Sequence, residues 1–223
     1  MSNESKESPY LRIMKLGRRL DNIPRFSNQP RIKDETVAAH SYNVALMVFL
    51  MASEMVELGY LVDVGECIKE ALLHDFPEAI TGDIIYPVKK HDKGHMNILG
   101  ALEDEMMAEA IPDTLPRYLR NLFIPTTAFE NSDEGLLVKF CDMCELVLHA
   151  VSERRLGNQY FNEFICKGLW YCYEMIYAEE ILRRSPMVKD MIMGLAVESH
   201  DFTEIDLEVV DVLCHLEGIR WNV

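Results

Sequence analysis

The stretch EALLHDFPEAITGDIIYPV, residues 70–88, places several metal-ligating and acidic side chains behind an apolar run. The apolar run before His74 and Asp75 is typical of a helix, so we expect a helix to carry this pair out of a core. Pro77 cannot continue a helix without losing a hydrogen bond, but it fits the first turn of a new one. Glu78 is therefore expected at a helix junction near the pair. Imidazole and carboxylate groups suit Mn, Fe, Co, Zn or Mg.

Two further candidate ligands lie on predicted helices. Thr36 can cap a helix that ends at Gly59 and carries His40 in its first turns. A single histidine on such a helix is more often a core residue than a ligand, so its metal role depends on partners. Asp142 lies in the apolar run LLVKFCDMCELVLHA, where a carboxylate is unfavourable unless it is paired or bound to metal. A salt bridge to Lys139 is the alternative for this carboxylate.

The connector IPRFSNQPRIKDET is basic within an acidic protein. Arg25 and Phe26 lie here, just before the first candidate ligand, where they can hold an anion; a solvated loop is the alternative interpretation. A second polar segment contains His91 and His95, whose spacing suits a metal only within a helix. Gly94 lies between these two histidines and disfavours that helix.

The charge of the chain limits its partners. It has 223 residues, with 22 Lys and Arg against 37 Asp and Glu, for a net charge of -15. Because polyanions are bound by clustered positive charge, we expect no nucleic-acid polymer and no anionic membrane surface as partner. A small phosphate ester stays possible, since a bound cation and one or two arginines reverse the field locally. No apolar run reaches the roughly 18 residues that span a bilayer.

The six cysteines do not suggest a disulfide framework. No secretory signal precedes them, and the first ten residues are polar. Cys141 and Cys144 form a CxxC, but the sequence has no second CxxC to complete a tetrahedral zinc site. We therefore expect reduced, mostly buried thiols in a cytoplasmic protein.

The apolar periodicity predicts an all-α chain of roughly eight to ten helices, because no long segment alternates with period two. We expect a core over residues 8–182 and a C-terminal helical extension over 183–223. The helices are expected at residues 10–20, 37–58, 63–74, 97–109, 133–156, 160–182, 187–198 and 204–217. Ser132 can cap the helix expected at 133–156.

The order His40, His74-Asp75, Asp142 resembles the metal-binding signature of the HD-domain phosphohydrolases. Within that superfamily, HDFPEAITGDIIYPVK resembles the HD(x)₂E(x)₂TGD(x)₃PVK segment of the YfbR-type 5′-deoxynucleotidases. ETVAAHS resembles their E-x-V-x-x-H-S, and LVKFCD resembles their LVK-x-x-D. The resemblance covers about residues 11–180 and implies an HD-domain helical bundle, which builds its metal site from side chains on facing helices.

The resemblance also implies roles for single residues. The two histidines and two aspartates of the signature bind one divalent ion, for which Co, Mn, Mg and Zn stay open. Glu78 matches the catalytic glutamate of the family. Arg25 matches the arginine that orients the substrate phosphate, and Asp75 borders the substrate as well as the metal.

The resemblance implies that Phe26, Asp83 and Tyr86 line the nucleotide pocket. Phe26 falls where bacterial members carry a tryptophan that crowds the sugar 2′ position and favours deoxyribose. Asp83 falls where the family contacts the sugar. Two departures from the family pattern affect this pocket: phenylalanine is smaller than tryptophan, and Tyr86 replaces a small hydroxyl residue.

These observations favour a metal-dependent 5′-nucleotidase that releases phosphate from (deoxy)nucleoside monophosphates. The small-molecule nucleotide is then the expected ligand, and by resemblance we expect a homodimer. Three alternatives stay open: an HD-type dNTP triphosphohydrolase, a non-enzymatic metal-binding module, and a two-iron HD-type oxygenase, which would need further ligands. Extra cations for a triphosphate would come from Lys33, Lys89 and Lys90.

Overall fold

A computed structural model describes the chain at residues 7–84, 93–123, 129, 131–200, 215, 216, 218, 219 and 221. Within these ranges the regular structure is helical, which confirms the all-α prediction. The chain divides into two compact units. The first comprises residues 1–28, 34–42 and 72–127, and the second comprises residues 29–33, 43–71 and 128–223. The division into residues 8–182 and 183–223 stays a prediction.

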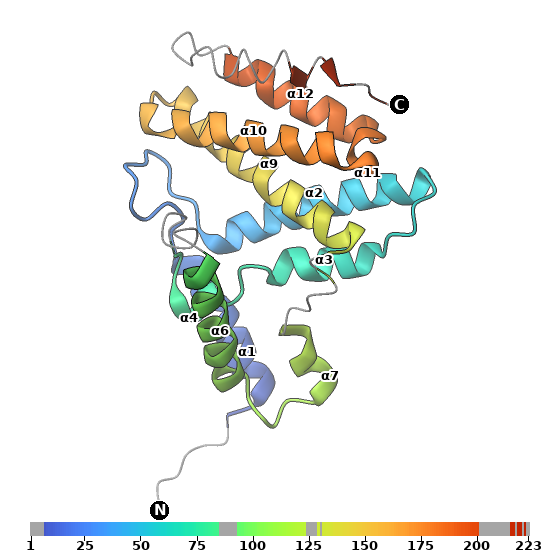
Figure 1. Cartoon of the computed structure of the whole chain (residues 1–223). Coiled ribbons are helices and arrows are strands. Elements are labelled where there is room, and N and C mark those ends of the chain that lie inside the picture. Colours follow the sequence, from blue (N-terminus) through green and yellow to red (C-terminus); the bar gives the residue numbers. More distant parts are fainter. Residues whose placement is uncertain are drawn as a thin grey trace, which may run out of the picture. The chain divides into compact units, whose positions relative to one another are not determined.

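The first unit contains several helices and the start of a further long one (Figure 1). Its elements are α1 (Pro9–Gly17), η1 (Arg18–Asn22), the start of α2 (Val37–Glu57), α4 (Glu78–Thr81), α6 (Lys93–Ala110), α7 (Arg117–Arg120) and η2 (Asn121–Phe123). Helix α1 contacts α4, and α4 also packs on η1 and α6. Their shared core consists of Leu16, Leu20, Val37, Phe76, Ala79, Met107, Ile111 and Leu115.

Phe76 attaches the His-Asp pair to that core. Its ring is buried, and it packs against the ring of Phe123 with centroids 4.9 Å apart. Burying a phenylalanine side chain stabilises the folded state by about 1.5–3 kcal/mol. The two residues before it are therefore held at the surface of a well-packed cluster.

The second unit contains the rest of α2, most of α3 (Val64–Leu73), α9 (Asp133–Arg155), η3 (Gln159–Phe161), α10 (Asn162–Ala178), α11 (Glu180–Arg183) and α12 (Pro186–His200). Helices α9 and α10 lie side by side (Figure 1). Gly168 permits this approach, because a Cβ atom there would lie 2.5 Å from Cγ2 of Val147. Cys144 and Cys172 meet across the same interface, with sulfur atoms 3.8 Å apart.

Local sequence signals set several helix ends as expected. Ser132 caps α9 by accepting a hydrogen bond from the Gly135 amide, and Thr36 accepts one from the Ala39 amide at the start of α2. Gly59 follows α2 with a φ of 87°, the left-handed conformation that glycine adopts without strain. Four cysteines are buried, as predicted: Cys67, Cys141, Cys144 and Cys172.

Three predicted helices differ from the structure or lie outside it. The helix expected at residues 160–182 is interrupted at Glu179, which is extended between α10 and α11. There the guanidinium of Arg183 donates to the carbonyl oxygens of Ile176 and Tyr177, so the last turn of α10 is satisfied without a continuing helix. The helix expected at 97–109 begins earlier, at Lys93. Most of the helix expected at 204–217 lies outside the described residues.

Candidate active site

His74 and Asp75 lie in the short turn between α3 and α4, within the first unit. The Glu78 amide donates to the Asp75 carbonyl oxygen at 3.0 Å, and α4 begins immediately after Pro77. The predicted helix junction is therefore present. Glu78 opens α4 with only 5% of its surface exposed.

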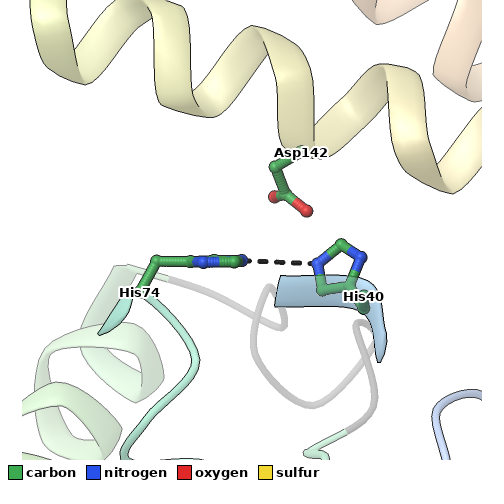
Figure 2. Close-up of side chains that lie close together, drawn as sticks. All are labelled: His40, His74 and Asp142. Carbon is green, nitrogen blue, oxygen red and sulfur yellow. Dashed lines mark hydrogen bonds between the residues drawn. The ribbon is translucent and has the colours of Figure 1, made fainter. Parts of the chain in front are cut away.

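His40 meets His74 in this unit. It lies in the first turns of α2 and is fully buried. The two Nε2 atoms are 3.3 Å apart, and the rings meet edge to face with centroids 5.3 Å apart (Figure 2). Oδ2 of Asp75 lies 3.3 Å from Nε2 of His74 and 3.5 Å from Nε2 of His40. Two imidazole nitrogens and one carboxylate oxygen therefore form a nearly equilateral triangle.

The dimensions of this triangle fit a metal ion. Donor atoms bound at about 2.1 Å to a tetrahedral cation lie about 3.4 Å from one another. The three observed separations, 3.3, 3.3 and 3.5 Å, agree with that spacing. Nitrogen and carboxylate oxygen are also the ligand types that divalent Mn, Co and Zn accept. The chain can therefore hold a divalent cation here.

Asp75 is kept in its charged form by its surroundings. Burial alone would raise the pKa of its carboxyl group, but His74, then His40 and then Arg25 oppose this and hold the pKa well below its usual range. A carboxylate that stays ionised is available as a metal ligand.

Asp142, the fourth predicted ligand, belongs to α9 of the second unit, and its side chain is partly buried. Figure 2 draws it together with the two histidines. Its role as a ligand stays a prediction.

A short antiparallel pairing within the first unit positions Arg25. The pairing is an isolated bridge between Pro24 and Thr36, flanked by two backbone hydrogen bonds. In one of them the Arg25 amide donates to the Glu35 carbonyl oxygen at 2.9 Å. Residues opposite each other in such a pairing project their side chains to the same side. Arg25 and Glu35 accordingly form an ion pair, with Nη1 and Oε2 2.9 Å apart.

The same Nη1 of Arg25 lies 2.7 Å from Nδ1 of His40. Both partners of the arginine are largely shielded from water, since the side chain of Glu35 is 10% exposed and that of His40 is 0% exposed. The predicted phosphate-binding arginine is thus held inside the protein by a carboxylate and a candidate metal ligand.

Phe26 has a backbone φ of 54°, a conformation that is strained for a residue with a side chain. Asp83 stabilises this conformation, because its Oδ2 accepts a hydrogen bond from the Phe26 amide at 3.0 Å. Gly82 turns the chain just before Asp83 with a φ of 74°. The turn of the Thr-Gly-Asp sequence therefore places the Asp83 carboxylate at the Phe26 amide. The Arg25 guanidinium lies 5.0 Å from the centroid of the Phe26 ring.

The structure therefore brings together most of the predicted site. Arg25, Phe26, His40, His74, Asp75, Glu78 and Asp83 all lie in the first unit. Asp83 was predicted to contact the sugar. The structure gives it a contact that the sequence did not predict, a hydrogen bond from the Phe26 amide. Tyr86 and His91 lie outside the described residues, and the side chain of His95 is also not described.

Comparison with known proteins identifies the family. The model of the 5′-deoxynucleotidase YfbR-like family matches residues 12–169. The chain belongs to this family. The YfbR-like match contains every predicted site residue, from Arg25 to Asp142, and it ends within α10.

Individual relatives agree with the YfbR-like assignment. A 5′-deoxynucleotidase from Shewanella oneidensis is 28% identical over 148 residues, which are 65% of this chain and 75% of that protein. The mouse 5′-deoxynucleotidase HDDC2 is 28% identical over 161 residues, 71% of this chain and 77% of the mouse protein. A crystal structure of an HD-domain phosphohydrolase from Listeria innocua covers 92% of this chain and 98% of its own, with a TM-score of 0.73 at 22% identity. This last likeness confirms the HD-domain fold.

Glu35 is the residue of this YfbR-like site that the sequence did not assign. It stands in the ETVAAHS motif, five residues before His40, where only the histidine had a predicted role. One signal for this role was present in the connector IPRFSNQPRIKDET. Acidic residues near its end could pair with Arg25 near its start. The connector contains two acidic candidates, Asp34 and Glu35, and the backbone register selects Glu35.

Proposed function

We propose that the protein is a metal-dependent 5′-deoxynucleotidase, which hydrolyses (deoxy)nucleoside 5′-monophosphates to nucleoside and phosphate. The observation that carries this proposal is the triangle of His40, His74 and Asp75, whose spacing suits a divalent cation. The family match and the relatives that are 5′-deoxynucleotidases support the substrate class. Asp142 is proposed as the fourth ligand on the basis of the LVKFCD motif.

A metal centre is suited to the difficulty of this reaction. A phosphate monoester is a dianion that repels hydroxide, and its uncatalysed hydrolysis is among the slowest biological reactions. A divalent cation at these ligands supplies Lewis acidity, which activates water and neutralises phosphate charge. The Asp75 carboxylate supplies negative charge, so the ligand set attracts a cation.

Arg25 and Glu78 supply the remaining chemistry from the first unit. The planar fork of the Arg25 guanidinium can hold two phosphate oxygens and favour the more charged transition state. Glu78 is a buried carboxylate three residues after Asp75, which suits it to exchange a proton with the water or with the leaving 5′-oxygen. Phe26 presents its ring beside Arg25 and is proposed to face the sugar.

The decisive experiment is a phosphate-release assay on protein stripped of metal and then loaded separately with Co²⁺, Mn²⁺, Mg²⁺ or Zn²⁺. We expect free phosphate from dAMP or another deoxynucleoside monophosphate, and no activity after chelation. The matched ribonucleotides measure how far Phe26 favours deoxyribose. Release of tripolyphosphate from dATP, without phosphate from any monophosphate, would instead identify a triphosphohydrolase.

One further expectation belongs to this proposal. A homodimer is expected from the family resemblance, and sedimentation of the purified protein measures it directly. None of the helices in the described ranges has the length and apolar character that a bilayer crossing requires.

A further inference from the structure

Arg25 contacts two side chains through a single nitrogen atom. Its Nη1 contacts both Oε2 of Glu35 at 2.9 Å and Nδ1 of His40 at 2.7 Å. A guanidinium has donors and no acceptor, so Nδ1 of His40 must be the acceptor in this contact. The ring hydrogen of a neutral imidazole then lies on the other nitrogen, Nε2.

Nε2 of His40 is the atom that the metal centre requires. It points into the triangle, 3.3 Å from Nε2 of His74 and 3.5 Å from Oδ2 of Asp75. A nitrogen that binds a cation must offer its lone pair, so the ring hydrogen of His40 has to move to Nδ1. Nδ1–H and the Arg25 N–H would then be two donors directed at each other, and their contact at 2.7 Å cannot persist.

Glu35 is the acceptor that can resolve this conflict. One of its carboxylate oxygens lies within 4.8 Å of a ring nitrogen of His40, and both residues are buried. A metal-bound histidine almost always donates its other N–H to a carboxylate, a carbonyl oxygen or water. The backbone pairing with Arg25 keeps the Glu35 carboxylate beside both of its possible partners.

We propose that Glu35 is a positioning residue that exchanges partners when metal binds. In the arrangement seen here it holds Arg25 beside His40. When a cation binds Nε2 of His40, Glu35 accepts the His40 Nδ1–H, and Arg25 is released for the substrate phosphate. Metal binding and phosphate binding are thereby coupled, and each favours the other to the same extent. This inference rests on the metal centre of the proposed function, but its tests use metal alone and need no substrate.

The first test follows the hydrogen on His40 by NMR of protein labelled with ¹⁵N-histidine, with the resonance assigned by its loss in His40→Gln. In metal-free protein we expect the hydrogen on Nε2, and after addition of Zn²⁺ we expect it on Nδ1. The Nδ1–H signal should lie far downfield in wild type, as for a hydrogen bond to a carboxylate, and should move upfield in Glu35→Ala. A hydrogen already on Nδ1 in metal-free wild type overturns the proposal.

The second test measures Zn²⁺ affinity by titration calorimetry. Removing a hydrogen-bond partner of a metal ligand typically weakens metal binding about 10–100-fold, and we expect this for Glu35→Ala. Glu35→Gln keeps an oxygen acceptor and should recover part of the loss. Arg25→Ala should bind Zn²⁺ more tightly than wild type, because the competing donor on His40 is gone.

Controls separate partner exchange from simple charge and from misfolding. Asp21→Asn removes one negative charge from the surface of the same unit, where Asp21 pairs with Arg18, so it measures the general effect of a lost charge. In the Arg25→Ala background, Glu35→Ala should still weaken Zn²⁺ binding. If Glu35→Ala has no effect in that background, or no more effect than Asp21→Asn, the exchange is disproved. Circular dichroism establishes that each variant is folded, and a wild-type protein that binds no metal would refute both the proposed function and this inference.

Discussion

Two buried glutamates, Glu35 and Glu153, have opposite kinds of partners. Glu35 in the first unit contacts side chains, with Arg25 bonded to its carboxylate and His40 close by. Glu153 on α9 of the second unit accepts from two backbone amides, those of Ile32 at 2.8 Å and Lys33 at 2.6 Å.

Glu153 also accepts from Nδ2 of Asn158 at 2.6 Å, and Asn158 donates in turn to the Pro30 carbonyl oxygen. Backbone amides cannot leave their place without unfolding the loop, so this carboxylate has a fixed task. The partners of Glu35 are side chains that can rotate. A buried carboxylate is therefore a candidate for function when its partners are free to change and for stability when they are not.

The largest expected effect comes from removing a metal ligand. His74→Ala or Asp75→Ala should abolish metal binding and reduce phosphate release by a factor on the order of 10⁴ or more, the size of loss seen when an essential catalytic group is deleted. Metal content by mass spectrometry and phosphate release measure this. Circular dichroism in metal-free buffer should show that both variants stay folded, because neither side chain belongs to the apolar core. Full activity in either variant contradicts the metal centre.

A substitution of Glu78 should lower turnover without loss of the metal. A positioned proton donor or acceptor contributes typically 10²–10⁴-fold, so Glu78→Gln should lose about that much in kcat while it keeps the metal. The amide preserves the size of a side chain that is 5% exposed. Glu163→Gln, on the surface of α10, is the matched control and should leave kcat unchanged. If Glu78→Gln turns over as fast as wild type, the catalytic role belongs to another group.

Glu153→Ala should act on stability alone. It leaves two part-buried loop amides and the buried Asn158 amide group without their acceptor, and an unsatisfied buried donor costs about 1–3 kcal/mol. We expect the free energy of unfolding to fall by about 1–3 kcal/mol, measured by urea denaturation. Its Zn²⁺ affinity should match that of wild type, in contrast to Glu35→Ala. A weakened Zn²⁺ affinity in Glu153→Ala would remove the distinction between the two glutamates.

The sequence predicted the helix ends and the candidate site residues better than the contacts between distant side chains. Caps at Thr36 and Ser132 and the break at Pro77 follow from local chemistry, and the structure has each of them. The family motifs placed His40 and His74 in one site, and the two imidazoles do meet. These features depend on a few neighbouring residues or on a recognisable motif.

The features that the sequence did not predict depend on distant partners. The interruption at Glu179 needs the side chain of Arg183 on the carbonyl oxygens before it, which no propensity encodes. A positive φ is expected at a glycine, not at Phe26. Asp83, which stabilises this conformation of Phe26, lies 57 residues away in the sequence. The pairing of Arg25 with Glu35 follows from the register of one bridge, and a one-residue shift would have changed the partner.

The smallest effect is a pH dependence of stability that belongs to Glu153. Burial alone would raise the pKa of its carboxyl group, but the bonds from the Ile32 amide, the Asn158 side chain and the Lys33 amide, together with nearby His149, bring the pKa below its ordinary 4.5. A carboxyl group with a lowered pKa in the folded state stabilises the protein above its ordinary pKa, and this contribution is lost as the pH falls through the folded-state value.

Glu153→Gln keeps the shape of the side chain but does not titrate, so it isolates this effect. The difference in unfolding free energy between wild type and Glu153→Gln should be constant from pH 7 to about pH 5 and should shrink below about pH 4.5. Urea denaturation across that range measures the difference. A difference that grows as the pH falls would mean that the loop amides do not stabilise the charged form. The buried Glu153 carboxylate would then lower the free energy of unfolding. The contrast with Glu35 would no longer rest on fixed backbone partners.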